Sequence, residues 1–198
     1  TTSMIQMAAG FCSVINGGNY YQPHVVKEIN SESGAVVSSN DNTLVKRVVS
    51  EDASKLIRKY LEKTVEDDEG TANPARVKGY VIGGKTGTAE KWPRNEGKYL
   101  VSFAGFTPTD KPELMIYVVI DEPHVSDQAH STYATEFASE VLKDVLPMLG
   151  IYKQTGKSDS AKKITLPSTK KGNQLLEVPK GGFSSSTYKV AKSKKNNG

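Results

Sequence analysis

The sequence predicts an α+β fold in which helices pack against an antiparallel sheet, and two observations support this. Apolar residues recur at helical spacing in three segments: near the N-terminus, after Ser50, and over residues 131–149. Three extended segments with short connections lie between the second and third helices, at residues 80–90, 99–106 and 113–121. Strands joined so closely cannot be parallel neighbours, so they predict an antiparallel meander.

The predicted helices have start or stop signals beside their apolar stripes. The first stripe ends at Asn16-Gly17-Gly18-Asn19, Ser50 is suited to cap the second helix, and Pro147 is expected to break the last turn of the third. The residues expected to face the core are Met4, Met7, Ala8, Phe11, Cys12 and Ile15 in the first helix, Ala53, Leu56, Ile57, Tyr60, Leu61, Thr64 and Val65 in the second, and Ala134, Phe137, Ala138, Val141, Leu142, Val145 and Leu146 in the third.

Residues 20–49 predict a β-hairpin. Residues 20–29 are typical of extended chain, and Ser31-Glu32-Ser33-Gly34 is typical of a turn. Residues 35–49 then indicate one or two strands, interrupted by a polar patch at residues 38–42.

Charge divides the chain into two parts. Of the 198 residues, 151–198 hold 11 of the 26 basic and 2 of the 22 acidic ones, so this part is +9 and residues 1–150 are −5. We predict a folded domain at 1–150 and a Lys-rich, low-complexity, disordered tail at 151–198. A small accessory module at residues 164–178, or a basic arm for an anionic polymer, is an alternative for the tail. Because the domain is mildly acidic, no nucleic-acid partner is expected.

Two classes of feature are excluded. The longest apolar run, residues 114–120, is far shorter than the ~20 residues of a membrane-spanning helix. Cys12 is the only cysteine, so an intrachain disulfide and a cysteine-based zinc site are ruled out, and we expect Cys12 to be a small buried hydrophobe.

Residues 79–86 match, letter for letter, the G-x-x-x-x-G-K-[ST] loop of nucleotide hydrolases. That loop needs a helix that begins at the Lys-Thr pair, so that backbone N–H groups face the phosphates. Here Tyr80-Val81-Ile82 fills the loop with strand-forming residues, and Gly87 and Pro93 follow where the helix should begin. The sequence therefore favours a strand over a phosphate site.

The other interpretation takes Lys85-Thr86-Gly87-Thr88 as part of a strand at a sheet edge. Gly87 lacks a side chain where another backbone must come close, which suits a peptide that pairs alongside as an extra strand. Thr86 and Thr88 offer hydroxyl groups to a carboxylate. Lys85 places an ammonium group where an anion or a deprotonating serine needs stabilisation, and a free N–H beside Gly87 could form half of an oxyanion hole.

Five segments together resemble the penicillin-binding transpeptidases, the serine acyl-transferases that cross-link peptidoglycan. They follow the family's order and spacing, at residues 2–18, 70–72, 83–90, 102–108 and 118–123. The most specific are G-G-K-T-G-T-A-E and S-F-A-G-F-T-P. The chain is most similar to the class B group, and the resemblance implies the serine β-lactamase/DD-peptidase-like fold.

The resemblance implies a role for each residue of the K-T-G strand. Lys85 would act electrostatically beside the serine of the family's S-x-N motif, and Thr86 and Thr88 would hold the carboxylate of a stem peptide or of a β-lactam. Gly87 would allow close approach, and the Thr88 N–H would complete the oxyanion hole. In the parent enzyme a D-Ala-D-Ala peptide would acylate a serine. The acyl group would then pass from the serine to an amine of a neighbouring peptidoglycan strand. Trp92 would either pack against the domain or form a wall of the substrate cleft.

The resemblance also implies a setting for the reaction. No metal or organic cofactor is implied. The expected location is the extracytoplasmic face of the bacterial plasma membrane, with the membrane anchor upstream of this chain.

The family's S-x-x-K and S-x-N motifs do not occur where the family places them. S-x-x-K occurs at Ser160, Ser168 and Ser186, after K-T-G and within the tail, and S-x-N occurs at Ser38, in the predicted hairpin. We therefore expect the nucleophile upstream of Thr1, in an N-terminal half of the domain that must combine with this chain, and we expect the chain alone to be inactive and poorly soluble. A non-catalytic family member that binds wall peptide or partners is the alternative.

Overall fold

The computed structural model describes residues 2–40 and 44–154, so the predicted tail lies outside the described residues except for its first four. The elements in the described residues are α1 (Met4–Ile15), β1 (Asn19–Tyr21), β2 (Glu28–Asn30), β3 (Val36–Ser39), β4 (Leu44–Arg47), α2 (Glu51–Glu66), the 3₁₀ turn η1 (Asn73–Ala75), β5 (Gly83–Glu90), β6 (Tyr99–Thr107), β7 (Leu114–Asp121) and α3 (Thr132–Met148).

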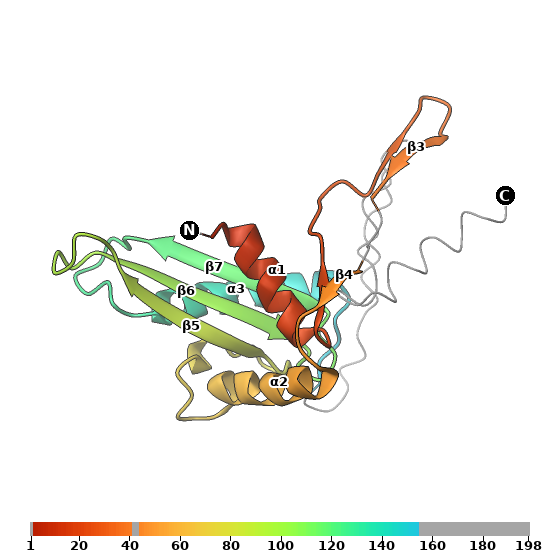
Figure 1. Ribbon diagram of the computed structural model, residues 1–198. Helices are drawn as coiled ribbons and strands as arrows, with labels where there is room; N and C mark the ends of the chain where they lie inside the picture. The colour runs from red at the N-terminus through yellow and green to blue at the C-terminus, as the bar shows by residue number, and fades with distance from the viewer. Residues whose placement is uncertain (1, 41–43, 155–198) are drawn as a thin grey trace.

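The central sheet has the order β5-β6-β7, with both pairs antiparallel, which confirms the predicted meander and the α+β class. Helices α1 and α3 lie on opposite faces of this sheet, and α2 runs beside the β5 edge (Figure 1). Residues alternate between the two faces along each strand. Phe106 therefore meets Phe11 of α1, with ring centroids 6.1 Å apart, while Phe103 packs in the cluster that includes α3.

The main core lies between the sheet, α3 and the segment that precedes β5. Phe103, Ile82, Leu142 and Leu146 are at most 1 % exposed, and Ile151 is also buried there. Burial of side chains of this size stabilises a fold by about 1.5–3 kcal/mol each. The sheet and α3 are therefore held together mainly by apolar contact.

The predicted hairpin is confirmed, but it is paired in two separate segments. Strands β2 and β3 pair near the turn, and β1 and β4 pair at the base, each with one register irregularity. The outer segment projects away from the rest of the molecule, as Figure 1 shows.

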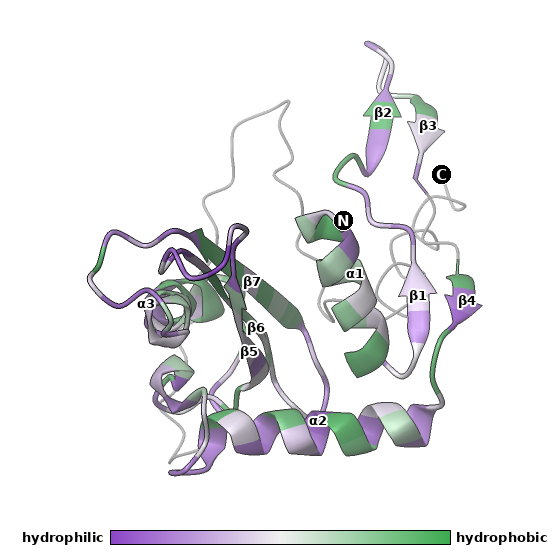
Figure 2. Cartoon of the chain, turned by 60° about the vertical axis from the view of Figure 1, so that its left-hand side comes forward, coloured by the Kyte–Doolittle hydropathy of each residue, from purple (hydrophilic) through white to green (hydrophobic). Residues whose placement is uncertain are grey.

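The apolar stripes are only partly buried, which corrects the predicted core. Leu56 and Tyr60 of α2 are 52 % and 60 % exposed, and Met4, Met7, Ile57 and Phe137 are exposed as well. The fully buried residues of α2 are Ser54 and Val65, of which only Val65 belongs to the predicted stripe. Helix α2 lies at the periphery of the molecule, so some of its hydrophobic residues face solvent (Figure 2).

Serine caps hold the starts of α1 and α2, and arginines from elsewhere hold their ends. Ser3 forms a capping box with Gln6. Arg58 donates to the carbonyl of Ile15 at the end of α1. Two carbonyls at the end of α2 accept hydrogen bonds from Arg76, which favours this helix end despite the acidic residues that follow it. Pro147 does not break α3, which continues to Met148, so that expectation was wrong.

A candidate substrate edge on strand β5

All four candidate residues, Lys85, Thr86, Gly87 and Thr88, lie in the middle of β5. The segment is an eight-residue strand with no helix at the Lys-Thr pair, which agrees with the choice of strand over nucleotide loop. Strand β5 pairs with β6 without a register shift from Gly83 to Glu90. Its other side is an edge of the sheet.

Helix α2 covers the first part of this edge. Glu66 Oε1 accepts a hydrogen bond from the Ile82 N–H at 2.9 Å, and the Thr64 hydroxyl donates to the Gly84 carbonyl. In antiparallel pairing the N–H and C=O of one residue point to the same side. The even-numbered residues from Ile82 onward therefore direct their backbone groups away from β6.

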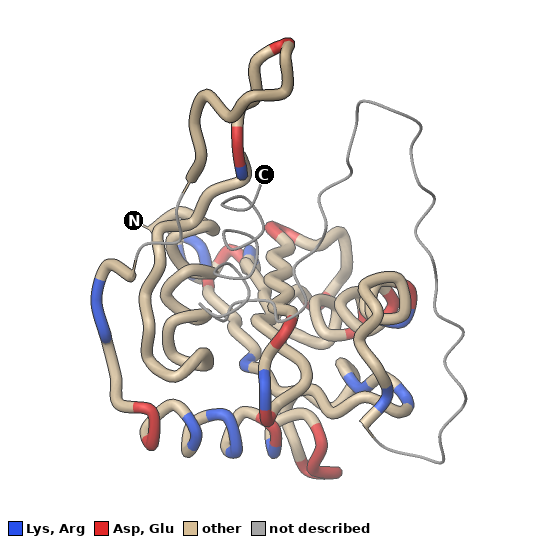
Figure 3. Tube along the Cα trace, turned by 90° about the vertical axis from the view of Figure 1, so that its right-hand side faces the viewer, with Lys and Arg blue, Asp and Glu red and all other residues tan. Residues whose placement is uncertain are grey.

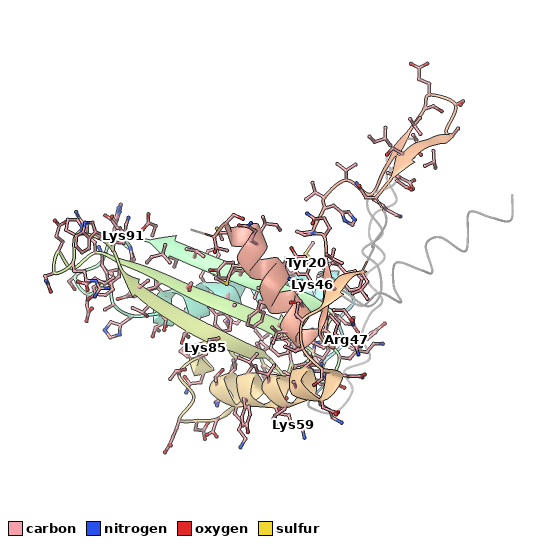
Figure 4. The ribbon with its side chains drawn as sticks, viewed as in Figure 1. Tyr20, Lys46, Arg47, Lys59, Lys85 and Lys91 are labelled. Carbon is pink, nitrogen blue, oxygen red and sulfur yellow. The ribbon has the colours of Figure 1, made fainter. Side chains whose placement is uncertain are left out.

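Beyond Gly84 the edge is open. The Thr86 carbonyl, the next even-numbered one, accepts a hydrogen bond from Lys85 Nζ at 2.8 Å instead of from a strand. The same alternation directs the Thr88 N–H to the open side. Lys85 and Thr88 are exposed, and Figure 4 shows Lys85 beside the β5 ribbon above α2. The open edge thus combines unpaired backbone groups, two hydroxyls and one ammonium group.

Glycine is needed at two of these positions because β6 comes very close. A Cβ on Gly84 would lie 2.5 Å from the Phe103 ring, and a Cβ on Gly87 would lie 2.6 Å from Ser102 Oγ. Phe103 is fully buried and cannot move aside. Gly84 is therefore fixed by core packing, whereas the neighbour of Gly87 is a small rotatable side chain.

The open edge ends in the 91–98 loop, which joins β5 to β6. Lys91 Nζ bonds Glu122 at 2.6 Å and Asp121 at 2.9 Å, and these contacts raise the pKa of Lys91 above its ordinary value. The two carboxylates thus tie the loop to the end of β7. Figure 3 shows that acidic and basic residues both occur along α2.

Other residues considered from the sequence lie away from the β5 edge. Ser38 and Asn40 are in the projecting hairpin, so this S-x-N match is not beside Lys85 (Figure 1). Cys12 is 8 % exposed, and its burial raises the pKa of the thiol to about 12, which confirms it as a buried hydrophobe. The serines of the S-x-x-K matches lie outside the described residues.

A cavity of about 370 Å³ lies between α1, the segment after β1, and β7. Its walls are mostly apolar, with Ile5, Cys12, Met115 and Tyr117 among them, and it includes no residue of β5. Within the part of the chain that the structure describes, no group of three or more His, Cys, Asp or Glu side chains could hold a metal ion.

The comparison with protein families gives a direct result. The family model for the penicillin-binding protein transpeptidase domain matches residues 1–143. The chain belongs to this family. The resemblance drawn from the K-T-G region and its flanking segments is thereby confirmed.

Individual relatives agree with the family. Stage V sporulation protein D of Bacillus subtilis is 39 % identical over 181 residues, which cover 88 % of this chain and 26 % of the relative. A peptidoglycan D,D-transpeptidase FtsI homolog of Chlorokybus atmophyticus is 34 % identical over 119 residues, 58 % of this chain and 16 % of the relative. The chain thus spans about a quarter or less of these relatives.

A solved structure extends the agreement to the fold. The transpeptidase domain of penicillin-binding protein 3 from Burkholderia pseudomallei superposes with a TM-score of 0.65 at 25 % identity, over 78 % of this chain and 45 % of that chain. The predicted fold class is therefore confirmed.

Sequence reasoning did not find the residues that cover the first part of the edge. The residues that bond the first part of this edge are Thr64 and Glu66, and Arg76 holds the end of α2 beside them, yet each lies at least 9 residues before Lys85. Glu66 lies in an exposed acidic run, residues 66–69, and nothing in the run distinguishes the one carboxylate that bonds β5.

Proposed function

We propose that this chain is the C-terminal half of the catalytic domain of a peptidoglycan D,D-transpeptidase. In this proposal the donor stem peptide pairs with the open edge of β5, with its terminal carboxylate at the hydroxyls of Thr86 and Thr88. The Thr88 N–H stabilises the oxyanion and Lys85 supplies positive charge beside the reacting serine. β-Lactams bind at the same edge and acylate the same serine.

One observation carries this proposal: the edge is covered by α2 up to Gly84 and open from Thr86 onward. A peptide can pair only with a strand edge that no other strand or helix occupies. At Gly84 the partner is Thr64 of α2, whereas at Thr86 it is the exposed side chain of Lys85, which supports an accessible edge at the K-T-G residues. Membership of the transpeptidase family supplies the reaction class.

The nucleophilic serine belongs, in this proposal, to a part of the parent protein that this chain does not include. The 45 % coverage of a transpeptidase domain supports this. The proposed location is the extracytoplasmic face of the bacterial plasma membrane, with an anchor elsewhere in the parent. Among the described residues, no helix combines the length and the apolar character needed to cross a bilayer.

The test is acylation of the full-length parent protein by a fluorescent penicillin. Lys85→Ala is expected to slow acylation by about 100- to 1000-fold, the usual cost of one electrostatic group in an acyl-transfer site. Lys78→Ala is the matched control, because Lys78 is an exposed lysine before β5 that makes no ion pair with a described residue.

Two results would contradict the proposal in different ways. Equal acylation rates for Lys85→Ala and Lys78→Ala would remove Lys85 from the site. A wild-type parent that binds wall peptide but is never acylated would be the non-catalytic family member that we hold as the alternative.

A further inference from the structure

The 91–98 loop continues the open edge of β5 and is held in place by several hydrogen bonds. The Lys91 N–H donates to the Lys98 carbonyl at 2.9 Å, and Glu90 accepts from the Asn95 N–H at 2.6 Å. The Lys91 side chain adds its two bonds to the end of β7. These bonds anchor the loop at both ends, residues 92–98 are exposed, and two of the exposed side chains are suited to bind a ligand.

The two side chains are Trp92 and Arg94. Trp92 is the only tryptophan of the chain and is 85 % exposed, although an indole gains most of its free energy when it is covered. Arg94 is exposed and makes no ion pair with any residue in the described ranges. An exposed tryptophan and an unpaired guanidinium on an anchored loop have the composition of a binding hot spot.

The direction of the donor peptide places its other end at this loop, an argument that rests on the proposed function. With the terminal carboxylate at Thr86 and the preceding carbonyl at the Thr88 N–H, the peptide runs antiparallel to β5. Its remaining residues therefore extend toward Glu90. Thr88 and Trp92 are four positions apart, or about 13 Å at about 3.3 Å per residue, so about four more substrate residues reach Trp92.

We propose that the 91–98 loop is a second substrate subsite, in which Trp92 and Arg94 bind the sugar-proximal part of the donor stem peptide. The chemistry of the two side chains indicates that this part of the donor presents a ring surface and a carboxylate. A sugar ring can stack on the indole face, and a guanidinium binds a carboxylate through two parallel hydrogen bonds. The subsite contacts the long natural donors. It does not contact short donors such as penicillin, which are too short to extend from Thr88 to the 91–98 loop.

The test compares two donors on the full-length parent protein. The long donor is a muramyl pentapeptide and the short donor is benzylpenicillin, and acylation efficiency is measured for each. Trp92→Ala is expected to lower the ratio of long-donor to short-donor efficiency about tenfold, the size of one such contact. Trp92→Phe should recover part of the ratio, and Tyr152→Ala, which removes an exposed aromatic outside the loop, should not change it.

A matched pair of long donors tests Arg94. With a carboxylate at the acidic position, Arg94→Gln should lower acylation efficiency about tenfold, whereas with a carboxamide there the wild type and Arg94→Gln should be equal. That pattern would support the subsite, because a purely structural arginine would affect both donors alike.

Two outcomes overturn the inference. If Trp92→Ala lowers acylation by both donors equally and also lowers the thermal midpoint, Trp92 packs against the rest of the protein. If neither donor is affected, the loop does not contact substrate. Both outcomes leave normal penicillin acylation of the wild type in place, whereas failure of the proposed function abolishes it.

Discussion

The two edges of the central sheet have opposite compositions. Strand β5 contains three glycines, a lysine and two threonines, and α2 covers only its beginning. Strand β7 has seven consecutive apolar residues before Asp121, and its outer side has no strand partner among the described residues. Both strands are eight residues long and both pair with β6, so length and pairing do not explain the difference.

The composition of β7 is typical of a strand inside a sheet. Natural edge strands are protected by charges, proline or bulges, but β7 pairs without a register shift and its only charge is at its end. A continuous apolar run indicates burial on both faces. The apolar cavity beside Met115 and Tyr117 lies along the same strand.

This difference in composition indicates which edge of the sheet stays without a strand partner in the parent protein. The β5 edge has the polar groups that the proposed substrate site requires, whereas the β7 edge has the apolar composition of a buried strand. We therefore expect another strand of the parent protein to pair with β7 and none to pair permanently with β5.

Among the tests that compare the two edges, the largest expected effect concerns Gly87. In the full-length parent, Gly87→Ala should slow penicillin acylation about 100-fold, because in the proposed site the added methyl group would stand where the substrate backbone approaches. The same methyl group would also lie 2.6 Å from Ser102 Oγ, so Gly87→Ala/Ser102→Ala is the control that removes this clash. Recovery of the rate in the double variant would mean that Gly87 serves sheet packing and not the open edge.

An intermediate effect is expected at β7. We expect this chain alone to self-associate through its unpaired apolar edge, and Val119→Lys should weaken that association about tenfold, as charges do on natural edge strands. Sedimentation velocity would measure the association constant, with near-UV circular dichroism to verify the fold. Thr88→Lys is the matched substitution on the other edge, and an equal effect there would remove the distinction between the two edges.

The smallest effect concerns Cys12, on the α1 face beside β7. The thiol pKa is raised from 9.0 to about 12 by burial, so the neutral form is favoured in the folded state. Its contribution to stability is complete below about pH 9 and is lost as the pH rises toward 12, because only the unfolded chain ionises easily. Urea unfolding at pH 8, 9 and 10 should show this decline, which Cys12→Ala should reduce. A parallel decline in Cys12→Ala would assign the pH dependence to other groups.

Much of the fold was predictable because it is encoded locally. The serine cap at Ser50, the three helices and the meander follow from spacing and turn residues within short windows. The candidate residues were found for the same reason, since residues 85–88 are adjacent and share one strand. What failed was the prediction of which apolar residues are covered, as at Leu56 and Tyr60, because coverage depends on distant neighbours.

The sequence by itself determined that Lys85, Thr86, Gly87 and Thr88 lie together on an extended strand, because alternation and glycine placement act over a few residues. Only the tertiary structure decided where that strand is open. The bonds from Thr64 and Glu66 to Gly84 and Ile82 join segments 16 to 20 residues apart, and they fix which backbone groups face α2 and which face solvent. A hydrogen bond between distant segments leaves no periodic pattern in the sequence, so the boundary between the covered and the open edge appears only when the helix and the strand are packed together.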